Sequence, residues 1–460
     1  MTNTVVEPRA SRNRRAVGAL WSLLAAHAIS QVGNVVTAFA IPFYVLAQGG
    51  SGVEVGVAAF FATAPVVVGG ALGGVVVDRV GHRRAALGAD VISGVTVLAM
   101  PILALTVGLP FWALLALVFA GGLLDTPGQT ARRVMLPELT ERAGVRLEQS
   151  VGLLDGTERF AKLIGASIAG LLVALVGPVA ALFVNAATFA LSALLTWAFV
   201  PSEALAHAIA HDPDPDIEIE IEIEINADAN STFANDTDAT GATPRPSYWA
   251  DLAEGFHFVI HDPLMRLIVA LVLITNLLDA ARGASLLPLY ANDRLGGAAA
   301  LGLLVAVMSG CALAGNIAFG FVAHRMPRRI TLAVCFALAG GPSSAAFALG
   351  APLPVLVAMT ALAGFAAGSL NPILGAVELE RVPTHMRGRV FGLINAGAWA
   401  GVPFGALLGG VAADTIGLSL AFGIVAVIYT VVTLTPLTGG AWKQMERRVL
   451  PEHPPRLPDV

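Results

Sequence analysis

The chain has 460 residues, of which 56% are hydrophobic and only 13% are charged. An average soluble domain carries about 25% charged residues, so this composition excludes a soluble globular protein of this size. The formal net charge of −5 divides unevenly, because residues 201–262 hold 14 acidic residues and one basic residue. That segment carries −13 and the remainder +8. This distribution leaves no basic face free to follow phosphates, so we expect no nucleic-acid partner.

Apolar segments long enough to cross a bilayer recur along the whole chain. A spanning helix needs about 20 mainly apolar residues, and the first segment is too long for the apolar region of a cleaved signal peptide. We therefore predict an all-α membrane protein with twelve transmembrane helices. These helices cover residues 17–47, 53–77, 85–107, 110–130, 150–176, 178–200, 264–291, 298–323, 330–349, 353–375, 388–413 and 417–438.

Arginine and lysine residues gather on one side of the predicted helices. The connections after even-numbered helices, the connection between the tenth and eleventh helices, and the C-terminal tail are all basic. The opposite connections contain a single basic residue, Arg294. Under the positive-inside rule this pattern predicts a multi-pass protein of the plasma or inner membrane with both termini in the cytoplasm.

An internal repeat divides the chain into two halves of six helices. A shift of 240 residues places Gly177 on Gly417, and a shift of 246 residues places residues 42–44 on residues 288–290. Parallel halves of this kind are a transporter architecture. The predicted segments are a cytoplasmic N-terminal tail (1–16), the N-terminal half (17–200), an acidic low-complexity cytoplasmic linker (201–246), an interfacial amphipathic helix (247–263), the C-terminal half (264–438) and a cytoplasmic C-terminal tail (439–460).

Charged side chains inside the predicted spans are the first candidates for function. Each costs at least about 2.5 to 3.5 kcal/mol at the centre of a bilayer, so each needs a partner, a wet cavity or a function. On the helix 150–176, Asp155 can pair with Arg159 one turn later, and Glu158 with Lys162. This group is either a site for substrate, coupling or gating, or a neutralised packing cluster.

Two further helices carry polar residues at helical spacing. The helix 264–291 has Asp279 and Arg282 three residues apart, with Asn276 one turn earlier, and the group is either a transport site or an internal ion pair. The helix 17–47 carries a polar stripe that either lines a cavity or joins helices by hydrogen bonds. The residues of that stripe are His27, Gln31 and Asn34.

The connection between the second and third helices resembles the signature loop of the major facilitator superfamily, G-x-x-x-D-R-x-G-R-R-R. It covers residues 74–84, and a degenerate copy covers residues 320–329. Three more stretches resemble the branch of that superfamily with enterobactin-exporter-like and macrolide-efflux-like proteins, namely residues 131–139, 254–258 and 387–393. The resemblance extends over about residues 17 to 438. It departs from the signature at His82, which replaces an arginine.

The resemblance implies a major facilitator fold, in which helices one, four, seven and ten line a central cavity. It also implies a latch that holds the outward-facing state and breaks in the other state. In this sequence the latch residues are Gly74, Asp78, Arg79, Gly81, Arg83 and Asp125. Glycine faces, including one at Gly397, Gly401, Gly405 and Gly409, permit close helix approach and mark either a sliding surface between the halves or static packing.

We therefore expect a monomeric secondary transporter that exports a small organic molecule, such as a drug, an antibiotic, a siderophore or a secondary metabolite. Its partners are that substrate and the lipid bilayer. The resemblance implies proton antiport, so we expect transport to be driven by an ion gradient, with no cofactor. The chain has no G-x-x-x-x-G-K-[ST] loop for ATP, and no metal-ligand set or nucleophile with a base indicates an enzyme. Uptake by symport and a non-transporting membrane scaffold or sensor remain as alternatives.

Overall fold

The computed structural model describes residues 14–201, 256–383 and 386–446. Within these ranges the chain is helical almost throughout and has no β-strand. Most of both predicted tails and the predicted acidic linker lie outside the described residues. Of the predicted interfacial helix, residues 256–261 are described and are helical, and Asp262 separates them from the next helix.

The N-terminal half is built from long helices joined by short turns. They are α1 (Arg14–Ala47), α2 (Gly52–Val80), α3 (His82–Thr106), α4 (Phe111–Arg142) and α5 (Leu147–Phe199).

The C-terminal half contains more breaks within its spans. Its helices are α9 (Pro263–Ala280), η1 (Ala281–Leu286), α10 (Leu287–Arg294), α11 (Ala298–Val322), η2 (Ala323–Arg325), α12 (Arg328–Ala348), α13 (Leu353–Ala367), α14 (Leu370–Arg381), α15 (Arg387–Ala400), α16 (Val402–Ile416), α17 (Leu418–Leu434), η4 (Thr435–Leu437) and η5 (Ala441–Glu446).

The chain crosses a bilayer twelve times, as the sequence predicted. Eleven helical segments of the described residues are long and apolar enough to span, and one of them, Gln149–Phe199, has 51 residues. At about 1.5 Å per residue it is more than twice as long as the 30 Å apolar core of a bilayer is thick. Gly177 breaks it with φ 83° and ψ 165°, and Gly417 adopts nearly the same conformation, φ 83° and ψ 156°, between α16 and α17. These are conformations that glycine adopts readily.

The fourth span runs farther than the sequence predicted. The expected helix ended at residue 130, whereas α4 continues to Arg142. The extra turns are stable because Ala131, Met135 and Leu139 recur at helical spacing and are buried in a hydrophobic core with α1 and α3. Charged residues on the other side of these turns had indicated a loop. The extension brings two arginines into contact with other helices, as described below.

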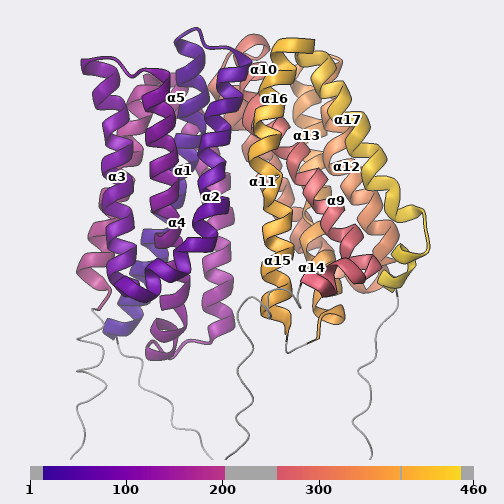
Figure 1. Ribbon diagram of the computed structural model, residues 1–460, viewed down its shortest axis with the longest axis horizontal. Helices are drawn as coiled ribbons and strands as arrows, with labels where there is room; N and C mark the ends of the chain where they lie inside the picture. Colours follow the sequence, from indigo (N-terminus) through magenta and orange to yellow (C-terminus); the bar gives the residue numbers. More distant parts are fainter. Residues whose placement is uncertain (1–13, 202–255, 384–385, 447–460) are drawn as a thin grey trace, which may run out of the picture.

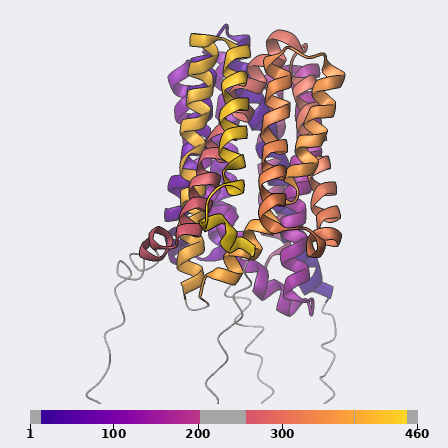
Figure 2. The same ribbon diagram turned by 90° about the vertical axis from the view of Figure 1, so that its right-hand side faces the viewer.

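The helices of both halves run nearly parallel to one axis (Figures 1 and 2). We call the end at which α1 begins and α4 ends the lower face, and the end at which α1 ends and α4 begins the upper face. Toward the upper face the halves share one hydrophobic core, in which Phe39 and Val173 cluster with Leu289 and Leu301. At the lower face the N-terminal half has a core of its own, to which the described C-terminal residues contribute nothing.

Glycines allow the halves to approach closely near the upper face. A Cβ atom at Gly170 of α5 would lie 2.7 Å from the Cα atom of Gly302 of α11. A Cβ atom at Gly410 of α16 would lie 2.8 Å from the Cα atom of Gly56 of α2. Real Cβ contacts are longer than this, so the two helix pairs pack backbone against backbone at these points.

The glycine face of α15 and α16 does not lie between the halves. Cβ atoms at Gly405 and Gly409 would lie 2.0 Å from the carbonyl oxygen of Leu277 and 2.5 Å from that of Ala281. Both of these carbonyls belong to the same half, on α9 and η1. Of the two roles that the sequence allowed for this face, the structure therefore shows packing inside the C-terminal half.

Candidate substrate and coupling sites

Glu158 on α5 is the centre of a charged cluster that joins three helices. Its Oε1 atom accepts a hydrogen bond from Arg133 of α4 at 2.5 Å, and the same oxygen lies 3.4 Å from Nε2 of His27 on α1. The His27 side chain is fully buried, whereas 56% of the Arg133 side chain is exposed. The cluster therefore connects a buried imidazole to a guanidinium at the protein surface.

The structure does not form the pair of Glu158 with Lys162 that helical spacing predicted. Because α4 continues beyond residue 130, Arg133 lies beside the carboxylate, while Lys162 is exposed. Neither Arg159 nor Lys162 has an ion-pair partner among the residues that the structure describes. The side chain of Asp155 lies outside them, so its predicted pairing stays a prediction.

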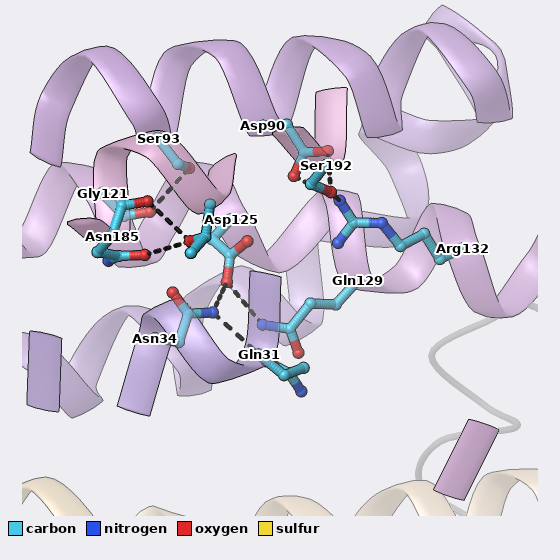
Figure 3. A network of polar contacts seen from close by, with 11 residues as sticks. Gln31, Asn34, Asp90, Ser93, Gly121, Asp125, Gln129, Arg132, Asn185 and Ser192 are labelled. Atoms are coloured by element: carbon cyan, nitrogen blue, oxygen red, sulfur yellow. Dashed lines mark hydrogen bonds and ion pairs between the residues drawn. The ribbon is translucent and has the colours of Figure 1, made fainter. Parts of the chain in front are cut away.

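Asp125 on α4 and Asn34 on α1 form a second polar contact, near the middle of the membrane spans (Figure 3). Asn34 donates from Nδ2 to Oδ2 of Asp125 at 2.9 Å and to Oε1 of Gln31 at 3.4 Å. Gln129 donates to the same Asp125 oxygen at 2.7 Å. Asp125 is 6% exposed, and its Oδ1 atom has no partner among the described residues.

Arg79 and Arg83 form no ion pair with Asp125 among the described residues, and the predicted latch, part of which lies outside them, stays a prediction. Asp125 is about 21 Å along α4 from its upper end, because the helix continues well past it toward the lower face. Arg83 instead donates to the carbonyl oxygen of Trp197 at 2.7 Å, and Arg79 is exposed. Gly81 takes φ 89° in the turn between α2 and α3, which explains a glycine there. The side chain of Asp78 and the surroundings of Gly74 lie outside the described part.

Arg132 is a buried charge that the sequence analysis assigned to a loop. It is fully buried, forms an ion pair with Asp90 of α3, and donates to Ser192 of α5 at 3.0 Å (Figure 3). Ser192 in turn donates to the second oxygen of Asp90 at 2.8 Å. The signal that could have found it is the helical spacing of apolar residues after residue 130.

Asp279 and Arg282 form the ion pair that was one of the two predicted alternatives. The Nη2 atom of Arg282 lies 2.9 Å from Oδ1 of Asp279, and Nη1 donates to Ser343 of α12 at 2.9 Å. Tyr429 of α17 donates to Oδ2 of Asp279 at 3.3 Å. The resemblance placed this helix on the central cavity, but these contacts lie within the C-terminal half. Asn276 donates to the carbonyl oxygen of Ala398 at 2.8 Å and joins α9 to α15.

The seventh span is locally unwound at this ion pair. Residues Ala281–Leu286 form the π-helix η1, with Arg282 in its first turn. Single π-turns inside α-helices are rare, and those that do occur often lie at functional sites. Ser285, within the π-turn, donates to the carbonyl oxygen of Ala406 on the neighbouring helix α16 at 2.6 Å, which anchors the π-turn to α16. The segment that carries Arg282 is therefore held in place by a contact with a second helix.

A cavity of about 150 Å³ lies beside Arg282. Its walls are mainly apolar and come from four spans of the C-terminal half. The lining includes Arg282, Leu304, Met308, Ser343, Phe347 and Thr360. Ser343 and Thr360 were not predicted as site residues, because single hydroxyl groups in apolar helices are common and carry no spacing signal. Among the described residues, no group of three or more His, Cys, Asp or Glu side chains is placed to hold a metal ion.

Comparisons with curated proteins identify efflux pumps as relatives. A protein called multidrug efflux pump Tap from Mycolicibacterium fortuitum is 29% identical over 412 residues, which cover 88% of this chain and 91% of the relative. A protein with the same name from Mycobacterium tuberculosis is 29% identical over 415 residues, which cover 88% of this chain and 89% of the relative.

Comparisons with solved structures show the fold. The nucleoside transporter NupG superposes with a TM-score of 0.63 at 13% identity and covers 92% of this chain and 98% of its own. A D-xylose-proton symporter gives a TM-score of 0.62 at 14% identity, with 92% and 96% covered. The family model described as Major Facilitator Superfamily matches residues 23–298 and 269–454. The chain therefore belongs to the Major Facilitator Superfamily.

Proposed function

We propose that this protein exports small amphipathic organic molecules across the cell membrane by alternating access, in antiport with protons. The observation that carries this proposal is the unequal contact of the two halves. Among the described residues they share a hydrophobic core toward the upper face but not at the lower face. Alternating access requires one repeat to rock against the other around a central site. The absence of a shared core at the lower face among the described residues supports a state that is open at that face.

The charge pattern supports a cytoplasmic lower face and two cytoplasmic termini. Exposed arginines occupy the connections at this face, among them Arg79, Arg84 and Arg325. Arg294 is the single basic residue of the upper connections. By the positive-inside rule the lower face is cytoplasmic, so the site is loaded from the cytoplasm in this state. One chain contains both halves, which supports a monomer as the transporting unit.

The relatives and the cavity support an amphipathic organic substrate. The relatives are named as multidrug efflux pumps. The cavity beside Arg282 has mainly apolar walls and few polar groups, which is typical of sites for small organic ligands. The ion pair of Asp279 and Arg282 leaves its polar wall with no net charge.

The cluster around Glu158 supports proton coupling. Histidine side chains serve as proton-binding groups in many proteins, and the one charged neighbour of His27 among the described residues is Glu158. Glu158 also holds Arg133, whose side chain reaches the surface toward the lower face. A proton bound by His27 or Glu158 changes the strength of the contact with Arg133, and this contact joins α5 to α4. We assign proton uptake and release to this cluster.

Transport by everted membrane vesicles tests the function. Vesicles that contain the full chain should accumulate ethidium or a neutral fluorescent amphiphile when an inside-acid pH gradient is imposed. Glu158→Gln should abolish the dependence on the gradient, and Asp279→Asn should lower uptake at saturating gradient. Glu138→Gln is the control, because Glu138 is exposed and pairs only with Arg142 one turn away among the described residues.

Three outcomes would contradict parts of the proposal. Unchanged flux in both Glu158→Gln and Asp279→Asn would remove the site assignments while leaving the fold. Movement of the probes in the opposite direction, together with protons, would indicate a symporter. The absence of flux for every probe in a broad panel would favour a membrane scaffold.

A further inference from the structure

We propose that the cavity beside Arg282 is a substrate subsite for an uncharged, ring-sized group that carries a hydrogen-bond acceptor, such as an aryl ketone, ester or ether. This inference rests on the proposed export function and specifies which part of a substrate enters the C-terminal half.

The volume of the cavity sets the size of the group. About 150 Å³ is free beside Arg282, and an apolar protein cavity of about this volume is large enough to bind benzene. Leu304, Met308 and Phe347 are among the apolar side chains that line it. A single aromatic ring with a short substituent therefore fits this space.

The polar wall of the cavity offers donors and few free acceptors. Arg282 donates to Asp279, to Ser343 and to the carbonyl oxygen of Ala339. A guanidinium has five N–H donors, so donors remain for a ligand. Both oxygens of Asp279 already accept hydrogen bonds, one from Arg282 and one from Tyr429. A carbonyl or ether oxygen therefore finds a partner here more readily than a donor group does.

The ion pair at the wall of the cavity disfavours an ionised group on the ligand. The Arg282 side chain is nine-tenths buried and is already neutralised by Asp279. An added anion or cation in an apolar cavity would lose its hydration without gaining a free counter-ion. The cavity thus favours a neutral group, even when the rest of the substrate is charged and lies elsewhere.

This polar wall is not required by the fold, because the N-terminal half lacks it. The shift of 246 residues that aligns residues 42–44 with residues 288–290 pairs Arg282 with Val36 and Asp279 with Gly33. Val36 is 1% exposed in the shared core. A Cβ atom at Gly33 would lie 2.0 Å from Oγ1 of Thr188, so even alanine is crowded there. The aligned positions of the N-terminal half therefore carry no counterpart of this ion pair.

The cavity also borders the contact between the halves. Leu287 lines it and packs against both the shared core and the core of the C-terminal half. Val305 lines it and packs against the shared core. A group bound here contacts residues that must move when the upper face opens, which links occupancy of the subsite to the transport cycle.

Acetophenone and cumene form a matched pair of probes, because both have one ring and nine heavy atoms but only acetophenone has an acceptor. Binding of each probe to the full chain in lipid nanodiscs is measured by saturation-transfer NMR and corrected with empty nanodiscs. We expect acetophenone to bind about tenfold tighter than cumene, the difference that one hydrogen bond to a charged donor supplies. Equal binding of the two probes, or none, would overturn the proposal.

Two variants identify where the probe binds. Replacing the ion pair in the double variant Asp279→Leu/Arg282→Met should abolish the preference for acetophenone. The matched control, Asp90→Leu/Arg132→Met, removes the buried ion pair of the other half and should leave the preference unchanged. Val305→Phe fills the cavity without touching the ion pair and should weaken both probes at least tenfold, which tests the site even when the double variant does not fold. A preference that survives these changes would contradict the assignment.

Ethidium uptake by the everted vesicles, which reports efflux activity, separates this inference from the export function. Acetophenone should inhibit efflux by the wild-type chain and have less effect on Val305→Phe. Binding of acetophenone without any efflux activity would refute the export function, and with it the role of the cavity as a substrate subsite. Normal efflux without acetophenone binding would refute the subsite and leave the export function standing.

Discussion

Asp414 of α16 holds the N-terminus of α2 through a hydrogen bond of 2.8 Å from the backbone N–H of Gly52 to its Oδ1 atom. The other carboxylate oxygen accepts from the N–H of Val53, also at 2.8 Å. The first N–H groups of a helix have no partner within the helix, and they attract negative charge. One carboxylate from the C-terminal half thus satisfies two such groups of the N-terminal half and closes the upper face.

We predict that Asp414→Asn shifts the protein toward the state that is open at the upper face. An amide has one acceptor oxygen and no charge, so one of the two hydrogen bonds is lost. Since a hydrogen bond contributes about 1 kcal/mol net, the ratio of open to closed protein should rise about fivefold. Distances between spin labels on α2 and α16 at the upper face measure this ratio.

Asp293→Asn is the control for that experiment. Asp293 is also exposed near the upper face, where it accepts a hydrogen bond from its neighbour Asn292. The substitution removes the same charge without touching α2. An equal shift in both variants would show that the net charge of this face, rather than the cap on α2, sets the balance.

A second prediction concerns the close approach of α5 and α11. Gly170→Ala should impair closure of the upper face, because the added Cβ atom would lie 2.7 Å from the Cα atom of Gly302. Gly152→Ala on the same helix is the control, since no heavy atom lies within 4 Å of the Cβ atom it would add. Efflux rates in vesicles should fall for the first variant and stay near wild type for the second. Equal rates would contradict backbone packing between these helices.

A third prediction tests the buried pair of Asp90 and Arg132. Asp90→Ala leaves a fully buried guanidinium without its counter-ion, and breaking a buried pair in this way costs about 3 to 5 kcal/mol. The double variant Asp90→Leu/Arg132→Met removes both charges and should recover most of that loss. Thermal unfolding of the purified protein measures both effects. A double variant as unstable as Asp90→Ala would show that the pair has a role beyond mutual neutralisation.

The number of spans and the repeat could be predicted from the sequence because their signals are local. Runs of about 20 apolar residues reveal a spanning helix wherever they occur. Gly177 and Gly417 end helices by their own backbone conformation, and both keep the predicted alignment. These features depend little on which helices pack together.

The partners of the buried charges depend on packing between distant segments, and spacing along one helix does not reveal them. Arg132 is buried because Asp90 and Ser192, from two other helices, surround it. Helical spacing allowed Glu158 to pair with Lys162, but it could not include Arg133, which was expected in a loop. The predicted end of α4 was wrong, because the helix continues to Arg142, and the missing contact of Arg133 with Glu158 follows from it.

The last prediction tests whether Arg133 or Lys162 is the functional partner of Glu158. Arg133→Gln removes the hydrogen bond to Glu158, so efflux driven by a pH gradient should fall severalfold, and its dependence on external pH should change shape. Lys162→Gln removes a positive charge from an exposed position on α5 and should leave both quantities near wild type. The two variants are compared at matched expression over a series of imposed gradients. A larger effect of Lys162→Gln would restore the pairing expected from helical spacing and remove Arg133 from the coupling cluster.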